Sequence, residues 1–324
     1  MAKSSWQRML VQIASTLLAV AVLLVAAGLS PALAQEPTMA SLGADAASVT
    51  RPHIGSAQHG YWLLGSDGGV FSFGAASFFG SMGGKALNRP IIGMTATSNA
   101  GGYWLVASDG GVFAFGDAGF YGSIPGLGLS PVDSPILPRL NAPIVGIVPS
   151  HDGRGYFLVA ADGGVFAFGD AKFEGSCPGI GGCFSSGTGI ADVMTDGTGN
   201  GYWVVSYGGD VHAFGDAVNY GGPASDLPYA TEVRSGVGTP NGNGYWILFS
   251  DGEIYSYGDA TYRGSPFGQI EFSNPTAAIV ATSDGGGYWV TTANGAVYTY
   301  GDAPYDGGIS TTHLNGLIVG ATGF

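Results

Sequence analysis

The stretch GYWLVASDGGVFAFGDAGFYG at residues 102–122 returns almost unchanged as GYFLVAADGGVFAFGDAKFEG at residues 155–175. The same unit aligns without a gap six times along the chain. The copies start at Gly60, Gly102, Gly155, Gly201, Gly244 and Gly287. A repeat that returns about every 40–50 residues is typical of the blades of a β-propeller.

Each copy contains two apolar segments with the pattern of buried strands. In YWLVAS, Tyr103 and Leu105 alternate with Trp104 and Val106, and both sets are apolar. Strands that are apolar on both faces must be covered on both faces. The SDGG between the segments suits a tight hairpin, because Asp-Gly and Gly-Gly adopt positive φ angles. A second turn at FGDA then leads into a short strand, GFYG.

A further strand precedes each later copy, for example PIIGMTA at 90–96 and PTAAIVA at 275–281. The chain ends on one more strand of this type, LIVGATGF at 317–324, while the segment from Pro52 before the first copy is shortened. An apolar strand left on an open array would be an exposed pairing edge. We therefore predict an all-β fold, a six-bladed β-propeller of four-stranded antiparallel blades, closed when the C-terminal strand joins residues 60–80. A seven-bladed ring that uses residues 36–59 is the alternative.

The N-terminus has the pattern of a secretory signal peptide. Lys3 and Arg8 precede a long apolar run at 9–29, and Ala32-Leu33-Ala34 forms a cleavage site of small residues. An uncleaved membrane anchor is the alternative, because the run is long. The predicted organisation is a signal peptide at 1–34, a flexible mature N-terminus at 35–51 and a propeller at 52–324, in a secreted or cell-surface protein.

The two cysteines of the chain, Cys177 and Cys183, lie in SCPGIGGCF. Export would place them in an oxidising compartment, and the Pro/Gly loop between them can bend back, so we predict a disulfide. Zinc would need two more ligands at suitable spacing, and no nearby histidine supplies them.

The charge balance argues against two classes of partner. The chain has 10 Lys and Arg against 23 Asp and Glu, a formal net charge of −13. Nucleic acids and anionic lipid headgroups are bound through Lys and Arg, so neither is expected as a partner. Aromatic residues make up 12% of the chain, which distinguishes it from a disordered, glycine-rich sequence.

The combination of Gly-Tyr-Trp, Ser-Asp-Gly-Gly, Phe-Gly-Asp-Ala and a closing aromatic-glycine pair resembles a repeat found in exported actinobacterial proteins. The resemblance covers essentially all of residues 60–324. It implies a propeller and export, and it implies no particular ligand. DGGVFAFGDAGFYG is also faintly similar to the propeller repeat of the regulator-of-chromosome-condensation type.

Most aspartates fall in the turns of the repeat, where a carboxylate hydrogen-bonds the nearby backbone. Clustered turn aspartates could also bind calcium, which takes several oxygen ligands. The sequence contains no twelve-residue calcium loop and no nonapeptide repeat. We therefore predict no cofactor, with calcium as the alternative.

Departures from the repeat supply the candidate ligand-binding residues. His212 replaces the first aromatic of VFAF in the fourth copy, where a packed residue between blades is the alternative. The penultimate position of the unit is variable, which we interpret as a solvent-exposed face of an outer strand, with a partner-facing surface as the alternative. The candidates are His212, Glu174, Arg263, Tyr121 and Tyr220.

The linker 123–154 is the longest, and its extra part at 124–140 is rich in proline and apolar residues. Extended loops on a rigid scaffold often bind ligands. A lid packed on the blade surface is the alternative. The cysteine loop 177–183 lies in the next linker and is expected on the same rim.

The sequence contains no nucleophile elbow and no phosphate loop, and its few, scattered glutamates do not identify a pair of catalytic carboxylates. We predict a secreted, non-catalytic propeller that binds an extracellular or cell-surface glycan or protein. The alternative is an extracellular hydrolase or lyase whose active site lies in the central channel. A channel lined by Glu, His and Arg with shifted pKa values would favour the enzyme. A lining of glycine, hydroxyl and aliphatic residues would favour binding.

Overall fold

The computed structural model describes residues 59–184, 189–223 and 231–324, all within the compact unit Gly55–Phe324. The predicted signal peptide at 1–34, the mature N-terminus at 35–51 and the shortened segment at 52–58 lie outside the described residues. Apart from turns and loops, the described part consists of β-strands and two short 3₁₀ turns, η1 (Pro125–Leu127) and η2 (Pro178–Ile180).

The described strands follow the repeat in chain order. They are β1 (Gly60–Gly65), β2 (Val70–Gly74), β3 (Ile91–Ala96), β4 (Gly102–Ala107), β5 (Val112–Gly116), β6 (Ile144–Pro149), β7 (Gly155–Ala160), β8 (Val165–Gly169), β9 (Ile190–Thr195), β10 (Gly201–Ser206), β11 (Val211–Gly215), β12 (Val233–Gly238), β13 (Gly244–Phe249), β14 (Ile254–Gly258), β15 (Thr276–Ala281), β16 (Gly287–Thr292), β17 (Val297–Gly301) and β18 (Ile318–Gly323).

These strands form six antiparallel sheets of three strands each, in the orders β18-β1-β2, β3-β4-β5, β6-β7-β8, β9-β10-β11, β12-β13-β14 and β15-β16-β17. The prediction of four strands per sheet is therefore wrong. The GFYG segment that was expected as the fourth strand does not enter a β-ladder in any described repeat.

Side chains take the hydrogen-bonding groups that a fourth strand would have used. In the second repeat, the indole Nε1 of Trp104 donates to the carbonyl oxygen of Gly119 at 2.6 Å. The hydroxyl of Tyr156, from the next sheet, donates to the carbonyl oxygen of Gly122, and the amide of Tyr121 donates to the same hydroxyl. Because a buried backbone group needs only one good partner, the segment is satisfied without a ladder.

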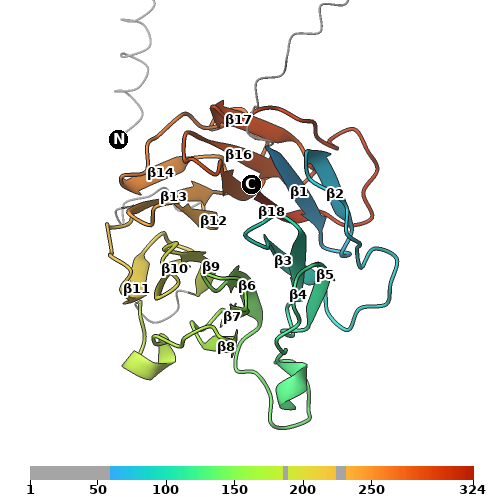
Figure 1. Cartoon of the computed structure of the whole chain (residues 1–324), viewed down its shortest axis with the longest axis vertical. Helices are drawn as coiled ribbons and strands as arrows, with labels where there is room; N and C mark the ends of the chain where they lie inside the picture. The colour runs from blue at the N-terminus through green and yellow to red at the C-terminus, as the bar shows by residue number, and fades with distance from the viewer. Residues whose placement is uncertain (1–58, 185–188, 224–230) are drawn as a thin grey trace, which may run out of the picture. The chain divides into compact units, whose positions relative to one another are not determined.

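The first strand of each sheet lies next to the first strand of the following sheet. Contacts of this kind join β3 to β6, β6 to β9, β9 to β12 and β12 to β15, and further contacts join β15 to β18 and β18 to β3. The C-terminal strand β18 pairs antiparallel with β1, with Tyr61 opposite Gly323 and Leu63 opposite Ala321. Figure 1 shows these first strands around one central region, with β2, β5, β8, β11, β14 and β17 outside them.

The apolar core lies between neighbouring sheets. The middle strand of every sheet is buried along its whole length, and its alternate residues contact the sheets on either side. Trp104 and Val106 of β4 pack against Tyr156 and Leu158 of β7, for example. The last such cluster places Trp289 of β16 against Tyr61 and Leu63 of β1. This arrangement accounts for strands that are apolar on both faces.

A tyrosine-to-glycine hydrogen bond recurs at all six junctions between repeats. The tyrosine hydroxyl of the middle strand donates to the carbonyl oxygen of the preceding repeat's closing glycine at 2.5–2.6 Å; the pairs are Tyr103–Gly80, Tyr156–Gly122, Tyr202–Gly175, Tyr245–Gly221, Tyr288–Gly264 and Tyr61–Gly307. Burial raises the pKa of Tyr61 to about 12, so this hydroxyl stays a donor at neutral pH.

The closing glycine is required for two reasons, which Gly122 illustrates. Its φ is 136°, a conformation that residues with a side chain rarely adopt. A Cβ at this position would lie 2.6 Å from the ring of Phe168 in the next sheet. The glycine therefore lets the backbone approach the aromatic core of its neighbour.

Candidate functional site

A central cavity of about 440 Å³ is lined by the first strands of the sheets. Hydroxyl, glycine and aliphatic residues dominate the lining, among them Thr95, Thr195, Gly236, Ile147 and Ile279. A smaller cavity of about 90 Å³ lies at the other end of the same strands. Asp192 and Ser235 line both cavities, so they lie between the two.

Asp192 occupies the third position of β9, where the other first strands have Gly93, Gly146, Ser235, Ala278 and Gly320. Its Oδ1 accepts a hydrogen bond from its neighbour, the amide of Val193, at 2.8 Å. Its Oδ2 accepts one from the amide of Gly236 on β12 at 2.9 Å. The carboxylate therefore ties two neighbouring first strands together and faces the cavity between them.

Burial raises the pKa of the Asp192 carboxyl to about 6, against the opposing effect of hydrogen bonds from Gly236, Val193 and Ser235. The ordinary value is 3.8, so the folded state takes up the proton first as the pH falls. Protonation of Asp192 therefore stabilises the folded state. This contribution is fully present below pH 3.8, and it is lost as the pH rises through about 6. The charge at the centre of the molecule thus changes in the mildly acidic range.

This shift predicts a pH-dependent effect of Asp192→Ala, a substitution that copies Ala278. We compare the free energy of unfolding of the wild type with that of the variant at pH 4.5 and at pH 7.5. The wild-type value, taken relative to the variant, is expected to fall by about 2 kcal/mol from the lower to the higher pH, because each unit of pKa shift corresponds to about 1.4 kcal/mol. Urea unfolding of both proteins at the two pH values measures the difference. A difference that does not change with pH would contradict the buried titration.

Asp192 and Arg234 are the charged residues among the described residues that line the two cavities. Arg234 is exposed at the smaller one. No second Asp or Glu side chain belongs to the described lining, so a pair of side-chain carboxylates as in glycoside hydrolysis is not found there. The lining is instead of the type that was expected for a binding protein.

The structure distributes the five predicted ligand-binding residues over separate places. His212 lies half-buried on β11 with its ring centroid 4.8 Å from that of Phe214. Glu174 is paired with the exposed Lys172 at 2.6 Å. Tyr121 donates its hydroxyl to the carbonyl oxygen of Gly153 at 3.1 Å.

Tyr220 packs its ring 6.0 Å from that of Tyr245, and Arg263 is exposed. The candidates at the penultimate position of the unit, Tyr121, Glu174, Tyr220 and Arg263, follow four different sheets. Among the described residues, no hydrogen bond, ion pair or ring contact joins any two of the five candidates. A role of the five residues in ligand binding stays a prediction.

The expected exposure of the penultimate position is wrong for four of its six residues. Phe79, Tyr121, Glu174 and Tyr220 are half-buried, because this position turns inward towards the tyrosine of the next sheet. The preceding position is the exposed one. Five of its six residues are aromatic and 55–64% exposed, namely Phe78, Phe120, Phe173, Tyr262 and Tyr305.

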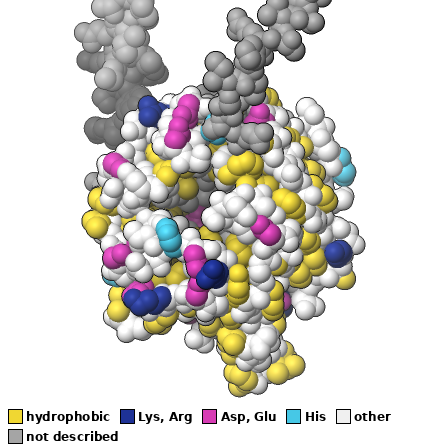
Figure 2. All heavy atoms as spheres, viewed as in Figure 1, with side chains coloured by type: hydrophobic (Ala, Val, Ile, Leu, Met, Phe, Trp, Pro, Cys, Tyr) yellow, Lys and Arg dark blue, Asp and Glu magenta, His cyan; other side chains and the backbone are white. Residues whose placement is uncertain are grey.

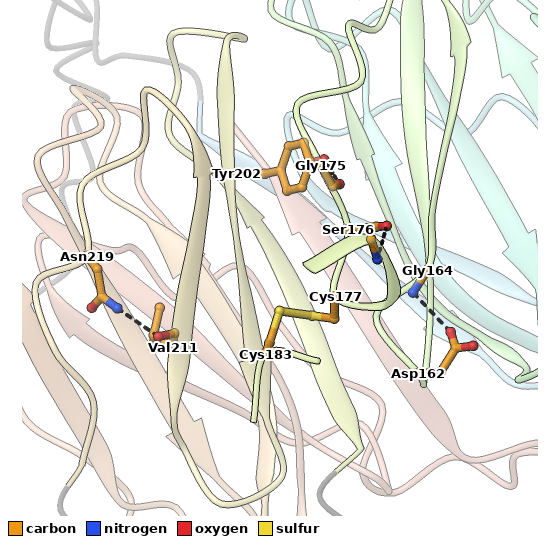
Figure 3. The surroundings of a disulfide bond; sticks show 10 residues. Asp162, Gly164, Gly175, Ser176, Cys177, Cys183, Tyr202, Val211 and Asn219 are labelled. Atoms are coloured by element: carbon orange, nitrogen blue, oxygen red, sulfur yellow. Dashed lines mark hydrogen bonds between the residues drawn. A yellow bond between two sulfur atoms is a disulfide. The ribbon is translucent and has the colours of Figure 1, made fainter. Parts of the chain in front are cut away.

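The long linker and the cysteine loop line one groove, as their neighbouring places in the sequence suggested. A cavity of about 340 Å³ has Leu129, Arg139 and Asn141 on one side and Ser176 and Pro178 on the other. The predicted disulfide between Cys177 and Cys183 is present, with 4.8 Å between the Cα atoms. Figure 3 shows it beside the turn of Asp162 and Gly164.

The turn aspartates have the predicted structural role. Asp109 Oδ1 accepts a hydrogen bond from the amide of Gly111, and Asp162 Oδ1 accepts one from Gly164. Asp117 and Asp259 accept hydrogen bonds from threonine hydroxyls in the third turn. Within the described residues, no three His, Cys, Asp or Glu side chains are grouped so that they could hold a metal ion. Calcium binding stays a prediction.

Sequence reasoning missed Asp192, although the signal was available. When the segments of the first strands are aligned with one another, and not only the repeated unit, Asp192 stands at a position where the other five segments have three glycines, an alanine and a serine. The exposed aromatic position was missed for a different reason. The sequence predicts a strand for this segment, and only the absence of the fourth strand reveals the exposure of its aromatic residue.

Comparison with known proteins supports the fold. No protein-family model matches the chain, and no curated protein is significantly similar to it. A solved structure titled as the crystal structure of a nidogen/laminin complex is similar, with a TM-score of 0.55 and 12% sequence identity over 82% of this chain and 98% of that chain. The chain is a β-propeller repeat protein. The likeness to exported actinobacterial proteins stays a prediction.

Within the described part of the propeller protein, no helix is long and apolar enough to span a membrane. The predicted signal segment or anchor at 9–29 lies outside that part. The disulfide indicates an oxidising environment, because such bonds persist mainly outside the reducing cytosol.

Proposed function

We propose that this protein is a closed, six-bladed propeller with three-stranded blades. The tyrosine-to-glycine hydrogen bond supports closure, because Tyr61 of the first repeat bonds Gly307 of the last in the same way as at the five internal junctions. The pairing of β18 with β1 supports it too. The sheet β18-β1-β2 contains the first and the last described strands, so it joins the first repeat to the last.

We infer that the propeller is an exported, non-catalytic module that binds an extracellular or cell-surface partner. The observation that carries this inference is the described lining of the central cavity, where glycine, hydroxyl and aliphatic residues surround one acidic side chain, Asp192. A rigid scaffold with long loops at one rim offers a binding surface without catalytic groups. The similar structure is titled as a complex of two proteins, so a propeller of this kind can take part in protein assembly.

The alternative function, an extracellular hydrolase or lyase, rests on Asp192. A carboxyl with a raised pKa inside a cavity is suited to donate a proton in catalysis. This alternative requires a substrate that reaches the centre of the propeller.

The test uses the chain from residue 35 onward, immobilised and exposed to extracellular proteins and surface glycans. We expect retention of at least one partner that is recovered intact, and equal retention by Asp192→Ala. Turnover in a panel of hydrolase and lyase substrates that is lost in Asp192→Ala would overturn the proposal in favour of the enzyme. Absence of both retention and turnover would overturn the binding function itself.

A further inference from the structure

The groove between the long linker and the disulfide loop has fixed walls. On the linker side, Ile124 and Leu140 are buried at 0% and 4% exposure, and the amide of Leu140 donates to the carbonyl oxygen of Ser130. Arg89, in the linker before β3, forms an ion pair with Asp133 and holds the outer part of the linker. A groove with walls held in this way is formed before a ligand arrives.

The opposite wall is held by the disulfide. Cys177 is 3% exposed, and its amide donates to the carbonyl oxygen of Gly163 at 3.1 Å. The bond to Cys183 closes the loop that contains Pro178 and that directly follows Ser176 (Figure 3). Ordering of loops is a main cost of binding, and here both loops are already ordered by covalent and hydrogen bonds.

The groove combines aromatic rings with planar polar groups. Phe166 is half-buried, while Phe173 is 55% exposed. Arg139, Asn141 and Asp162 line the same groove and are exposed. Asp162 uses Oδ1 in its turn, and no described partner of Oδ2 is found.

This chemistry matches a sugar ring better than an extended apolar peptide. A pyranose presents a flat face of C–H groups that can lie on an aromatic ring, and its edge carries neighbouring hydroxyls. Carboxylate, amide and guanidinium groups can each bond two such hydroxyls at once. The charges of Arg139 and Asp162 cancel, and the net charge of −13 disfavours an anionic polymer.

We propose that this groove binds a neutral saccharide chain, with Phe173 as the stacking platform and Asp162, Asn141 and Arg139 as hydroxyl-binding groups. This inference rests on the proposed binding function and names its ligand class.

The exposed tip of the linker is a different surface. Its Ile136 and Leu137 are 67% and 73% exposed, and hydrophobic side chains gather at the lower end of the face in Figure 2.

The test measures binding of soluble neutral oligosaccharides of glucose, galactose, mannose and N-acetylglucosamine by calorimetry, after a glycan array has selected the best of them. Phe173→Ala is expected to weaken binding at least tenfold. The matched control is Phe78→Ala, which removes a phenylalanine at the same repeat position with 60% exposure but outside the groove. We expect this control to bind within twofold of the wild type.

A second variant, Asp162→Asn, separates recognition from folding. Asn294 accepts the amide hydrogen of Ala296 in the equivalent turn of the last repeat, so asparagine preserves the local structure. Binding is expected to fall several-fold with an unchanged melting temperature. Equal losses in Phe173→Ala and Phe78→Ala would overturn the site. Retention of a protein but of no saccharide would overturn this inference and leave the proposed function standing, whereas retention of neither would overturn both.

Discussion

A chain that ends at Gly316, and so lacks Leu317–Phe324, is expected to lose its cooperative unfolding transition. The deletion removes β18, which pairs with β1 and contacts β3 and β15. It also removes Ile318, which is 2% exposed, from the cluster around Trp289. The loss should exceed about 5 kcal/mol, which is comparable to the whole stability of a typical folded domain. Thermal unfolding followed by near-UV circular dichroism measures the result.

The matched control is a chain that ends at Gly323. It keeps β18 and loses only Phe324, which is half-buried with its ring centroid 5.4 Å from that of Trp62. We expect a cooperative transition with a loss of about 2 kcal/mol. A chain ending at Gly316 that melts as cooperatively as this control would show that the first and last repeats do not depend on each other.

The repeat and the two-faced strands were predictable because each follows from a local pattern of residues. The partner of the C-terminal strand followed from a comparison of the two ends of the repeat array, where the segment before the first copy is shortened. Tyr103 and Trp104 must both be buried, and only sheets on both sides can bury them. The GFYG segment was predicted wrongly, because its composition is that of a strand. Its partners, Trp104 Nε1 and Tyr156 Oη, come from other strands, and one of them comes from the next repeat.

The candidate sites were less predictable for a related reason. The groove depends on the meeting of two linkers, which their order in the chain suggested, but its lining also includes Phe166 and Asp162 from β8 and its turn. The environment of Asp192 depends on Gly236 and Ser235 of a different repeat. Variability at the penultimate repeat position directed attention to Glu174 and Arg263. Such variability indicates that different residue types are tolerated at the position, and it does not indicate which residues lie close together.

Trp289→Ala is expected to destabilise the protein as strongly as Trp104→Ala, although Trp289 lies in the last repeat and Trp104 in an internal one. Both side chains are 0% exposed, and both indoles donate to a backbone carbonyl, of Pro304 and Gly119 respectively. Each variant should lose about 3–5 kcal/mol, the cost of emptying a buried Trp site. That loss corresponds to a fall in melting temperature on the order of 10 °C.

The comparison tests closure because the two tryptophans would differ in an open array. In a linear stack, a terminal repeat contacts a neighbour on one side, so its outward residues contribute little. In the structure, Trp289 packs on Tyr61 of the first repeat with ring centroids 5.4 Å apart, and Trp104 packs on Tyr156 at 5.9 Å. Urea unfolding of both variants should give losses within about 1 kcal/mol of each other. A loss for Trp289→Ala below half of that for Trp104→Ala would favour the open stack, because the contact with Tyr61 would then contribute nothing in solution.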